Sequence, residues 1–139
     1  VVNQATGVRY RATRRGGATK DGKAIEPSGC QEMSQAIVAF SGYPSRHMGW
    51  SQYRSLGAAA LDLCAVASGS LDAFVDCAPT PLAPWDYLGA LLVCREAGAS
   101  IIEASGRDLV VTEFGPRRAP LAAATPELLA QVMAARRSL

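Results

Sequence analysis

The stretch PWDYLGALLVCREAGA, residues 84–99, decides the fold, because both of its ends carry helix signals. Pro84 suits a first helical turn, where its missing N–H is no loss, and Asp86 places a carboxylate among the unpaired N–H groups there. Good helix formers fill the interior, and Gly98 follows them as a stop signal. Trp85 beside that carboxylate, close to small residues, indicates a place where a ligand is held against the start of a helix.

Segments on both sides of this helix predict a layered α/β domain. Further helices are predicted over residues 57–69 and from 126 to about 137. Strands are predicted over residues 36–40, 52–56, 71–77, 100–104, 109–112 and 121–124. This order of elements is typical of a central sheet covered by helices. The loop between the first two of these strands holds the only histidine, His47, which we interpret as an exposed loop residue.

Residues 1–28 have the pattern of an antiparallel hairpin. Val8, Tyr10 and Ala12 alternate with arginines, which is the period of a half-buried strand. Asp21-Gly22 is a tight-turn pair. Residues 1–23 carry six basic side chains and one acid, and we interpret this basic face as a solvated sheet edge. A nucleic-acid surface is the alternative, but Tyr10 is its single aromatic residue, so we predict no nucleic-acid partner.

Composition limits the protein class. A chain of 139 residues with 49% hydrophobic residues and a net charge of +2 suits one globular domain. Its longest apolar run, Leu88 to Cys94, is far shorter than the ~20 residues of a membrane span, and no signal-peptide pattern opens the sequence. The four cysteines are irregularly spaced, which favours reduced thiols over a disulfide framework. We therefore predict a cytoplasmic protein without membrane association.

Four collinear segments resemble the inositol monophosphatase family. Residues 85–99 are similar to the family's C-terminal signature of Trp-Asp, small residues, an apolar run and Glu-Ala-Gly. Residues 54–63 are similar to its Arg-x-x-Gly-Ser-Ala-Ala-Leu-Asp-Leu helix start. Residues 67–74 resemble its Ala-x-Gly-x-Leu-Asp-Ala-Tyr segment, and residues 14–23 its Gly-rich hairpin. The resemblance covers almost the whole chain.

This resemblance implies a fold and an activity. The fold is the C-terminal half of the layered αβαβα sugar-phosphatase fold, a mixed sheet flanked by helices. Residues 1–33 would be a hairpin of the N-terminal sheet and residues 34–139 the C-terminal α/β domain. Family members are Mg²⁺-dependent, lithium-sensitive phosphomonoesterases, commonly dimers, so a homodimer acting on a small phosphorylated substrate is expected. Inositol phosphate is the first expectation, with histidinol phosphate, fructose bisphosphate and nucleoside 3′,5′-bisphosphate as alternatives.

The resemblance also assigns residues. Asp86 corresponds to a metal ligand, and a hard carboxylate oxygen suits Mg²⁺. Asp76 corresponds to an acidic residue that contacts a substrate hydroxyl. Gly57, Ala58 and Ala59 correspond to the substrate-binding helix start. Two departures stand out, because relatives often carry Ser or Thr at position 58, and Leu88 replaces a small residue and is expected to reshape the pocket. Two further acids, at positions 62 and 72, are interpreted as structural.

Two family motifs have no counterpart here. The Glu-Glu region and the Asp-Pro-x-Asp-Gly-Thr motif, which supply the other metal ligands, match nothing in the sequence. No catalytic residue beyond the metal ligand is therefore assigned, and one carboxylate cannot hold a pair of Mg²⁺ ions. We expect a C-terminal half that is inactive as an isolated chain, and the start at Val1 agrees with this. The alternative is a non-catalytic binding or assembly module that needs the missing half.

Overall fold

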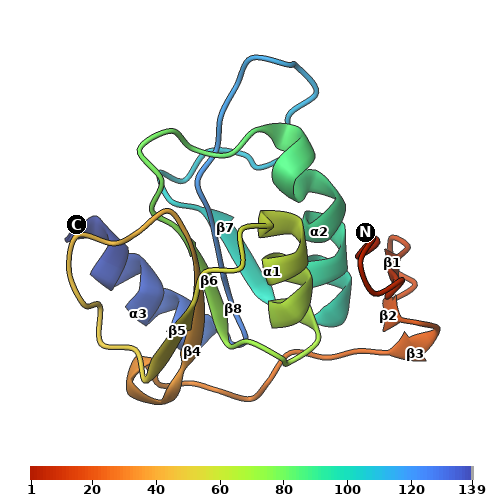
Figure 1. Cartoon of the computed structure of the whole chain (residues 1–139), viewed down its shortest axis with the longest axis horizontal. Helices are drawn as coiled ribbons and strands as arrows, with labels where there is room; N and C mark the ends of the chain where they lie inside the picture. Colours follow the sequence, from red (N-terminus) through yellow and green to blue (C-terminus); the bar gives the residue numbers. More distant parts are fainter. Residues whose placement is uncertain (139) are drawn as a thin grey trace.

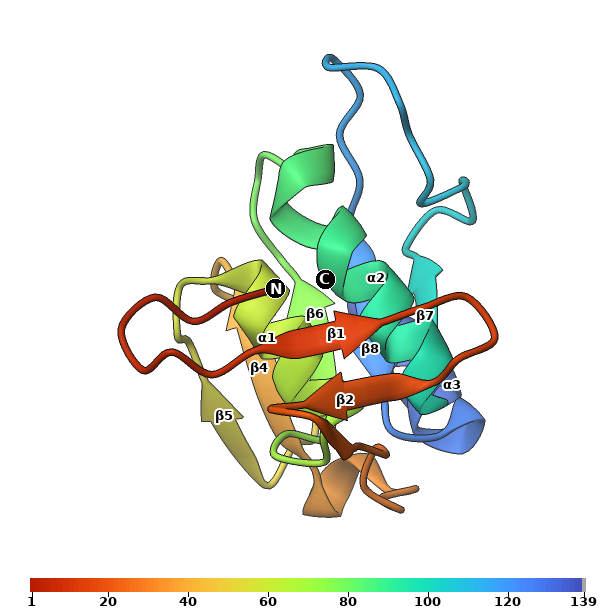
Figure 2. The same cartoon turned by 90° about the vertical axis from the view of Figure 1, so that its right-hand side faces the viewer.

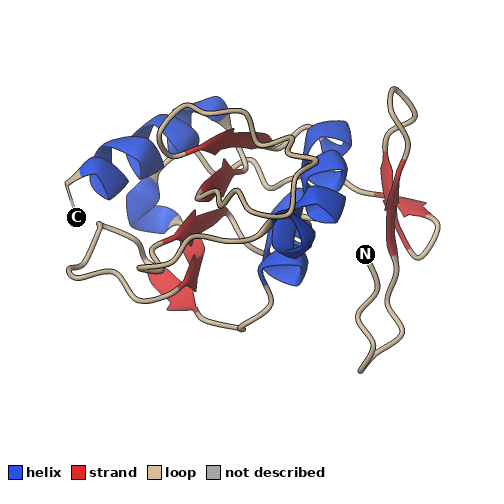
Figure 3. Cartoon of the chain, turned by 90° about the horizontal axis from the view of Figure 1, so that it is seen from above, coloured by secondary structure: helices blue, strands red, loops and turns tan. Residues whose placement is uncertain are grey.

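The computed structural model describes residues 1–138 and arranges them in four layers. Helix α3 (Pro126–Arg137) covers one face of a five-stranded sheet, and helices α1 (Ala59–Ala67) and α2 (Pro84–Ala97) cover the other. A three-stranded sheet lies beyond α1 and α2, on the side away from the large sheet (Figures 1 and 3). This arrangement confirms the predicted mixed sheet flanked by helices and preceded by antiparallel strands.

The large sheet mixes parallel and antiparallel pairs. Its strands are β4 (Ile37–Ser41), β5 (Gln52–Arg54), β6 (Ala73–Asp76), β7 (Ser100–Glu103) and β8 (Pro120–Ala123), in the order β5-β4-β6-β8-β7. Strand β4 runs parallel to β5 and β6, whereas β8 runs antiparallel to β6 and β7. Every residue of β6 and β8 is buried, because helices cover both faces of the sheet centre.

The small sheet packs on α2. It consists of β1 (Tyr10–Ala12), β2 (Ala18–Lys20) and β3 (Lys23–Ala24), all antiparallel, and crosses in front of the helices (Figure 2). Tyr10 is buried and Arg11 is exposed, as the alternation predicts. Asp21 and Gly22 both have positive φ, which is the tight turn that joins β2 to β3. The outward arginines therefore lie on the solvent face of this sheet.

The core lies on both sides of the large sheet. Between the sheet and α1/α2 the helices approach closely, and the Cys94 thiol donates to the Leu63 carbonyl oxygen at 3.3 Å. Burial raises the pKa of the Cys64 thiol to about 12. The cysteines of the described chain are free, as predicted. On the other side, Phe40, Leu128 and Val132 form the core under α3.

The helix ends follow the local signals. Pro84 begins α2, and Gly98 ends it with a left-handed φ of 94°. Thr125 caps α3 by accepting a hydrogen bond from the Leu128 N–H at 3.2 Å. A short 3₁₀ helix, η1 (Met33–Gln35), precedes β4. Within residues 1–138, every helix is too short or too polar to cross a membrane.

One predicted strand is wrong. Residues 109–112 form no strand and belong to the long connection between β7 and β8. Leu109 and Val111 are buried and Val110 is exposed, so the alternation is real. Among the described residues the segment pairs with no strand, and β7, the edge strand of the sheet, pairs only with β8. The segment is held by a side chain instead, as the Tyr87 hydroxyl donates to the Leu109 carbonyl oxygen at 2.8 Å.

Candidate functional site

A cavity of about 430 Å³ lies where α1 and α2 begin. Both helices start at the same end of the molecule, next to the end of β4 (Figure 1). The lining comes from these three places and consists of Phe40, Ser41, Gly42, Ser55, Gly57, Ala58, Ala59, Ala60, Asp62, Leu82, Trp85 and Asp86. Two converging helix N-termini make such a cavity favourable for an anion, because unpaired N–H groups and both helix dipoles point into it.

The start of α1 is built for close approach. Gly57 has a φ of 79°, which side-chain-bearing residues rarely adopt. Ala58 is the N-cap residue and offers no side-chain oxygen to the first-turn N–H groups. These groups and the small side chains of Ala59 and Ala60 face the cavity. The structure thus brings together the three residues that the resemblance assigns to substrate binding, Gly57, Ala58 and Ala59.

Asp86 lies in the first turn of α2 and lines the same cavity. Its Oδ2 accepts a hydrogen bond from the Ala83 N–H at 2.9 Å, which fixes the side chain against the helix start. Its Oδ1 accepts no hydrogen bond from the described chain. The side chain is half-buried. Asp86 therefore keeps one oriented carboxylate oxygen for a ligand.

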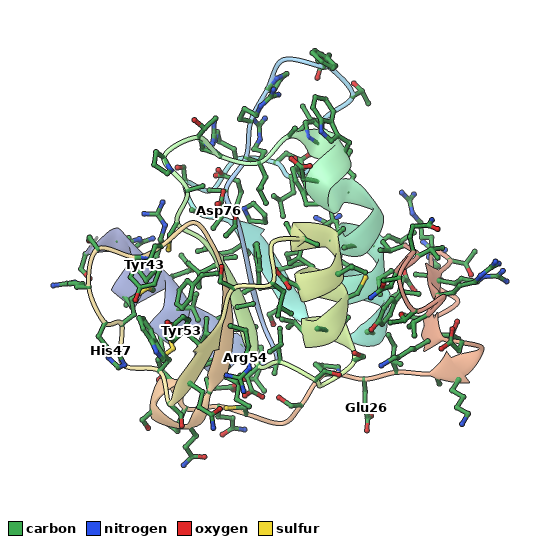
Figure 4. The ribbon with its side chains drawn as sticks, in the orientation of Figure 1. Glu26, Tyr43, His47, Tyr53, Arg54 and Asp76 are labelled. Carbon is green, nitrogen blue, oxygen red and sulfur yellow. The ribbon has the colours of Figure 1, made fainter. Side chains whose placement is uncertain are left out.

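Asp76 does not line this cavity, but its carboxyl interacts with Ser41 and Leu82, which do. It ends β6, is 1% exposed, and its Oδ1 accepts a hydrogen bond from the Ala78 N–H at 3.1 Å. Burial raises the pKa of Asp76, against the opposing effects of that N–H and of Arg136. Its sheet partner Ser41 lines the cavity, but Asp76 itself does not. Figure 4 shows Asp76 within the fold at the end of its strand.

The position of Leu88 corrects an expectation. Its half-buried side chain packs with the core between the helices and the sheets, and it does not line the cavity. It lies two residues beyond Asp86, and on a helix such positions do not share a face. The Leu88 side chain therefore contributes to the packing of the helix and is not part of the cavity lining.

Asp62 lines the cavity, although the sequence suggested only a structural role for it. The side chain is 1% exposed, and its Oδ1 has no hydrogen-bond partner in the described chain. Burial alone raises its pKa from 3.8 to about 6. The signal that could have revealed it is its spacing. Asp62 follows Ala59 by three residues, which places both on one helix face.

An aromatic rim stands beside the cavity. Trp85, which lines it, is 57% exposed, and the Phe114 ring lies 4.8 Å from the Trp85 ring between centroids. The Arg117 guanidinium lies 5.2 Å from the same indole. Phe114 and Arg117 come from the long β7–β8 connection, so no local sequence pattern pairs them with Trp85. The β7–β8 connection that carries Phe114 and Arg117 extends at one end of the molecule (Figure 2).

The donor set fits part of a magnesium site. Mg²⁺ is bound in proteins through one or two carboxylates, water and substrate phosphate. Asp86 supplies one free carboxylate oxygen next to two helix N-termini. Residues 1–138 contain no group of three His, Cys, Asp or Glu side chains that could hold a metal ion. This chain can therefore contribute to a shared Mg²⁺–phosphate site but does not contain a complete all-protein ligand set among its described residues.

Known proteins share this sequence and fold. The chain is 33% identical over 115 residues to the fructose-1,6-bisphosphatase/inositol-1-monophosphatase of Archaeoglobus fulgidus, covering 82% of this chain and 44% of that protein. It is 31% identical over 139 residues to the putative Nus factor SuhB of Neisseria meningitidis serogroup B, covering 89% and 50%. A Pyrococcus horikoshii protein, PH1897, described as similar to inositol-1 monophosphatase, superposes with a TM-score of 0.81 at 26% identity, covering 96% and 54%.

The chain spans about half the length of the curated relatives it matches. The sequence model of the inositol monophosphatase family matches residues 1–139. The fold agrees with this match, as does the cavity at which the Trp-Asp helix start meets the small-residue helix start. The chain therefore belongs to the inositol monophosphatase family.

Proposed function

We propose that the cavity between α1 and α2 is part of a site for Mg²⁺-dependent hydrolysis of a small phosphate monoester. One observation carries the proposal: two helix N-termini, both with an alanine N-cap residue that supplies no side-chain cap, open into a cavity that Asp86 also lines. A phosphate dianion is favoured by the N–H groups and dipoles, and a divalent cation by the carboxylate. Membership of a phosphatase family supports the same activity.

Different residues of this chain are proposed to bind the phosphate, the metal and the rest of the substrate. The first-turn N–H groups of α1 hold the phosphate oxygens, with Gly57 and Ala58 permitting the close approach. Asp86 holds the metal through the oxygen that Ala83 leaves free. Bound Mg²⁺ supplies charge that lowers the pKa of a coordinated water and stabilises the leaving oxygen. Asp76 is proposed to orient a substrate hydroxyl from the end of β6.

The finer identity of the protein is also a proposal. Inositol phosphate is the first candidate substrate, and the name of the archaeal relative supports testing fructose 1,6-bisphosphate beside it. Histidinol phosphate and nucleoside 3′,5′-bisphosphate complete the panel. We further propose a cytoplasmic homodimer, in which residues outside this chain complete the metal ligands. The isolated 139 residues are expected to release no phosphate.

Asp86→Asn in the full-length protein tests the proposal. The amide oxygen still accepts the Ala83 hydrogen bond, so the helix start is preserved, but the charge that binds the metal is lost. Mg²⁺-dependent phosphate release from the panel should fall by about a hundredfold or more, with an unchanged melting temperature. Retained activity with a normal Mg²⁺ dependence would remove Asp86 from the metal ligands.

A binding module without turnover is the second candidate. The observation that favours it is that no three ligating side chains meet within residues 1–138. The full-length protein distinguishes the two candidates. Phosphate release from any member of the panel supports the enzyme, whereas binding of inorganic phosphate without turnover, at saturating Mg²⁺, supports the module.

A further inference from the structure

Strand β7 forms one edge of the five-stranded sheet. Among the described residues it pairs only with β8, and Figure 2 shows it on the opposite side of the sheet from β5. Its sequence, SIIE, contains no Lys, Arg or Pro, which are residues that commonly keep an edge strand from pairing. None of its residues lines the cavity of Asp86. This edge is therefore a second place at which the fold can meet another molecule.

The bonds to β8 show which backbone groups of β7 point outward. The Ala104 N–H donates to the Ala119 carbonyl oxygen at 2.9 Å, so these residues are a hydrogen-bonded pair at the end of the β7–β8 ladder. Along an antiparallel ladder, hydrogen-bonded and non-hydrogen-bonded positions alternate. Ser100 and Ile102 therefore bond to β8, and the N–H and C=O of Ile101 point away from it.

The other side of β8 gives the same result. The Ala124 N–H donates to the Asp72 carbonyl oxygen at 2.8 Å, which continues the antiparallel ladder between β8 and β6. By the same alternation, the backbone groups of Ala122 bond towards β6. Ala122 is the residue opposite Ile101 in the register of β7 and β8. Ile101 therefore receives no backbone bond from β8.

Three outward backbone groups of β7 have no partner. The Glu103 carbonyl oxygen accepts a hydrogen bond from the Gly106 N–H at 2.9 Å and is satisfied. The N–H and C=O of Ile101 and the N–H of Glu103 bond to no other backbone group within residues 1–138. Backbone groups are seldom left unpaired beside apolar side chains. One added strand would supply all three with partners.

A groove of about 560 Å³ runs along this edge. It is lined by β7, by the loop after it and by the ends of α2 and α3. Ile101 packs with the core on the α1/α2 side of the sheet, and Ile102 packs with the core under α3. Leu109 and Met133 add apolar surface to the groove. Because neighbouring residues of a strand face opposite sides, an added strand would contact both layers.

The groove carries more positive than negative charge. Arg95 lines it from the last turn of α2 and Arg137 from the last turn of α3. Both are exposed, and neither forms an ion pair within the part of the chain that the structure describes. Arg107 is paired with Glu103, and Asp108 is the other acid of the lining. An occupant of the groove thus meets a guanidinium on each face of the sheet.

We propose that β7 binds an acidic, extended segment of a partner protein as an added strand. The free backbone groups of Ile101 and Glu103 bond to the segment, and its carboxylates pair with Arg95 on one face and Arg137 on the other. In strand addition, backbone hydrogen bonds give affinity and contacts to alternate side chains give specificity. This surface is separate from the proposed phosphatase site and does not depend on it.

A second copy of this chain is the competing occupant. Pairing of two β7 edges would bring Arg95 and Arg137 of one copy close to the same arginines of the other. Like charges brought together in an interface oppose association, and charged side chains at an edge are a common protection against such pairing. The charge of the groove therefore favours an acidic partner over a second copy.

Residue-resolved amide hydrogen exchange of the full-length protein tests the proposal. The probe is an acidic peptide of about eight residues, with a pair of Glu at each end and alternating Val and Thr between them. Each Glu pair presents a carboxylate to both faces of the sheet. At saturating peptide, the N–H groups of Ile101 and Glu103 should exchange about tenfold more slowly or less. Exchange at Ser100 and Ile102, which already bond to β8, should be unchanged.

Charge variants and a modified peptide separate strand addition from simple attraction. With a fluorescein-labelled peptide followed by anisotropy, Arg95→Gln with Arg137→Gln should weaken binding about tenfold. Arg14→Gln with Arg15→Gln removes two charges from the small sheet and should bind as the unaltered protein does. The same peptide N-methylated at its central residues keeps its charge but has lost those N–H donors, so it should not bind.

Four results would overturn the proposal. The first is the absence of peptide binding, or binding that leaves exchange at Ile101 and Glu103 unchanged. The second is equal affinity for the N-methylated peptide, which would show charge attraction without strand pairing. The third is an equal loss of binding in the small-sheet control. The fourth is slower exchange at both residues as protein concentration rises without peptide, which would assign this edge to a second copy.

Discussion

Asp62 lies 1% exposed in the first turn of α1, with one carboxylate oxygen that accepts no hydrogen bond from the described chain. A buried, unpaired charge destabilises a fold, and the protonated form is favoured instead. This explains why burial raises its pKa from 3.8 to about 6. Asp62 lines the cavity at the two helix N-termini. Its charge therefore changes the electrostatic field that acts on a ligand in the cavity.

The buried Asp62 carboxyl should make the stability of the fold depend on pH. The folded state holds the proton more tightly than the unfolded state, so the free energy of unfolding should fall as pH rises from about 4 to about 6 and stay lower above that. The loss is on the order of 2 kcal/mol. Asp62→Asn should remove this dependence and raise the melting temperature at pH 7.5, with little effect at pH 4. Thermal unfolding across this pH range measures it, and a lower melting temperature at pH 7.5 would show that Asp62 is a stabilising charge.

At the scale of elements, Glu96 fastens the small sheet to α2. Its two carboxylate oxygens accept hydrogen bonds from the Arg15 N–H at 2.9 Å and the Gly17 N–H at 3.1 Å. These N–H groups lower the pKa of Glu96. Both donors belong to the turn between β1 and β2, so a side chain near the end of α2 holds a turn some eighty residues earlier in the chain.

Glu96→Ala should therefore loosen the small sheet without unfolding α2. We expect faster amide hydrogen exchange at positions 15 and 17 and along β1 and β2, with protection in β6 and β8 unchanged. Glu26→Ala is a matched control, because Glu26 is exposed and its side chain points away from the fold (Figure 4). Unchanged exchange at positions 15 and 17 in Glu96→Ala would assign the attachment of the sheet to Tyr10 packing instead.

At the scale of the whole molecule, the pKa of Glu103 is shifted in the opposite direction to the pKa of Asp62. Burial by itself would raise its pKa, but the Arg107 guanidinium and the N–H groups of Ala119, Ser105 and Arg107 outweigh burial and hold it at about 2. The Arg107 Nη2 lies 2.6 Å from Glu103 Oε1. This network joins the two ends of the β7–β8 connection that carries the aromatic rim.

The pH dependence of the whole molecule should therefore have a maximum. Stability from Glu103 is present above about pH 4.5 and is lost as pH falls towards 2, whereas stability linked to protonated Asp62 is lost as pH rises through 6. Denaturant unfolding between pH 2 and 8 should show greatest stability near pH 4 to 5. Glu103→Gln should reduce the acid decline and lower stability at neutral pH, and a profile identical to that of the unaltered protein would contradict this network.

Much of the fold follows from local sequence signals. Pro84, Gly98 and Thr125 mark helix ends because caps and stops act within one turn of the backbone, so their neighbours suffice. The Asp21-Gly22 turn is local in the same sense. The residues that line the cavity at positions 57–59 and 86 could also be named, because they belong to the segments that resemble the family's motifs.

Other features depend on which distant segments meet. Alternation at residues 109–112 predicted a strand, but a strand needs a paired neighbour, and the fold holds this segment through the Tyr87 hydroxyl instead. Asp62 and Asp76 look alike in sequence as acids among apolar residues, yet packing puts one in the cavity lining and the other outside it. Sequence by itself determined the helix ends, the order of elements and the family. Tertiary structure alone decided which buried carboxylate faces the cavity and which rings meet at the surface, because burial and contact depend on the whole fold.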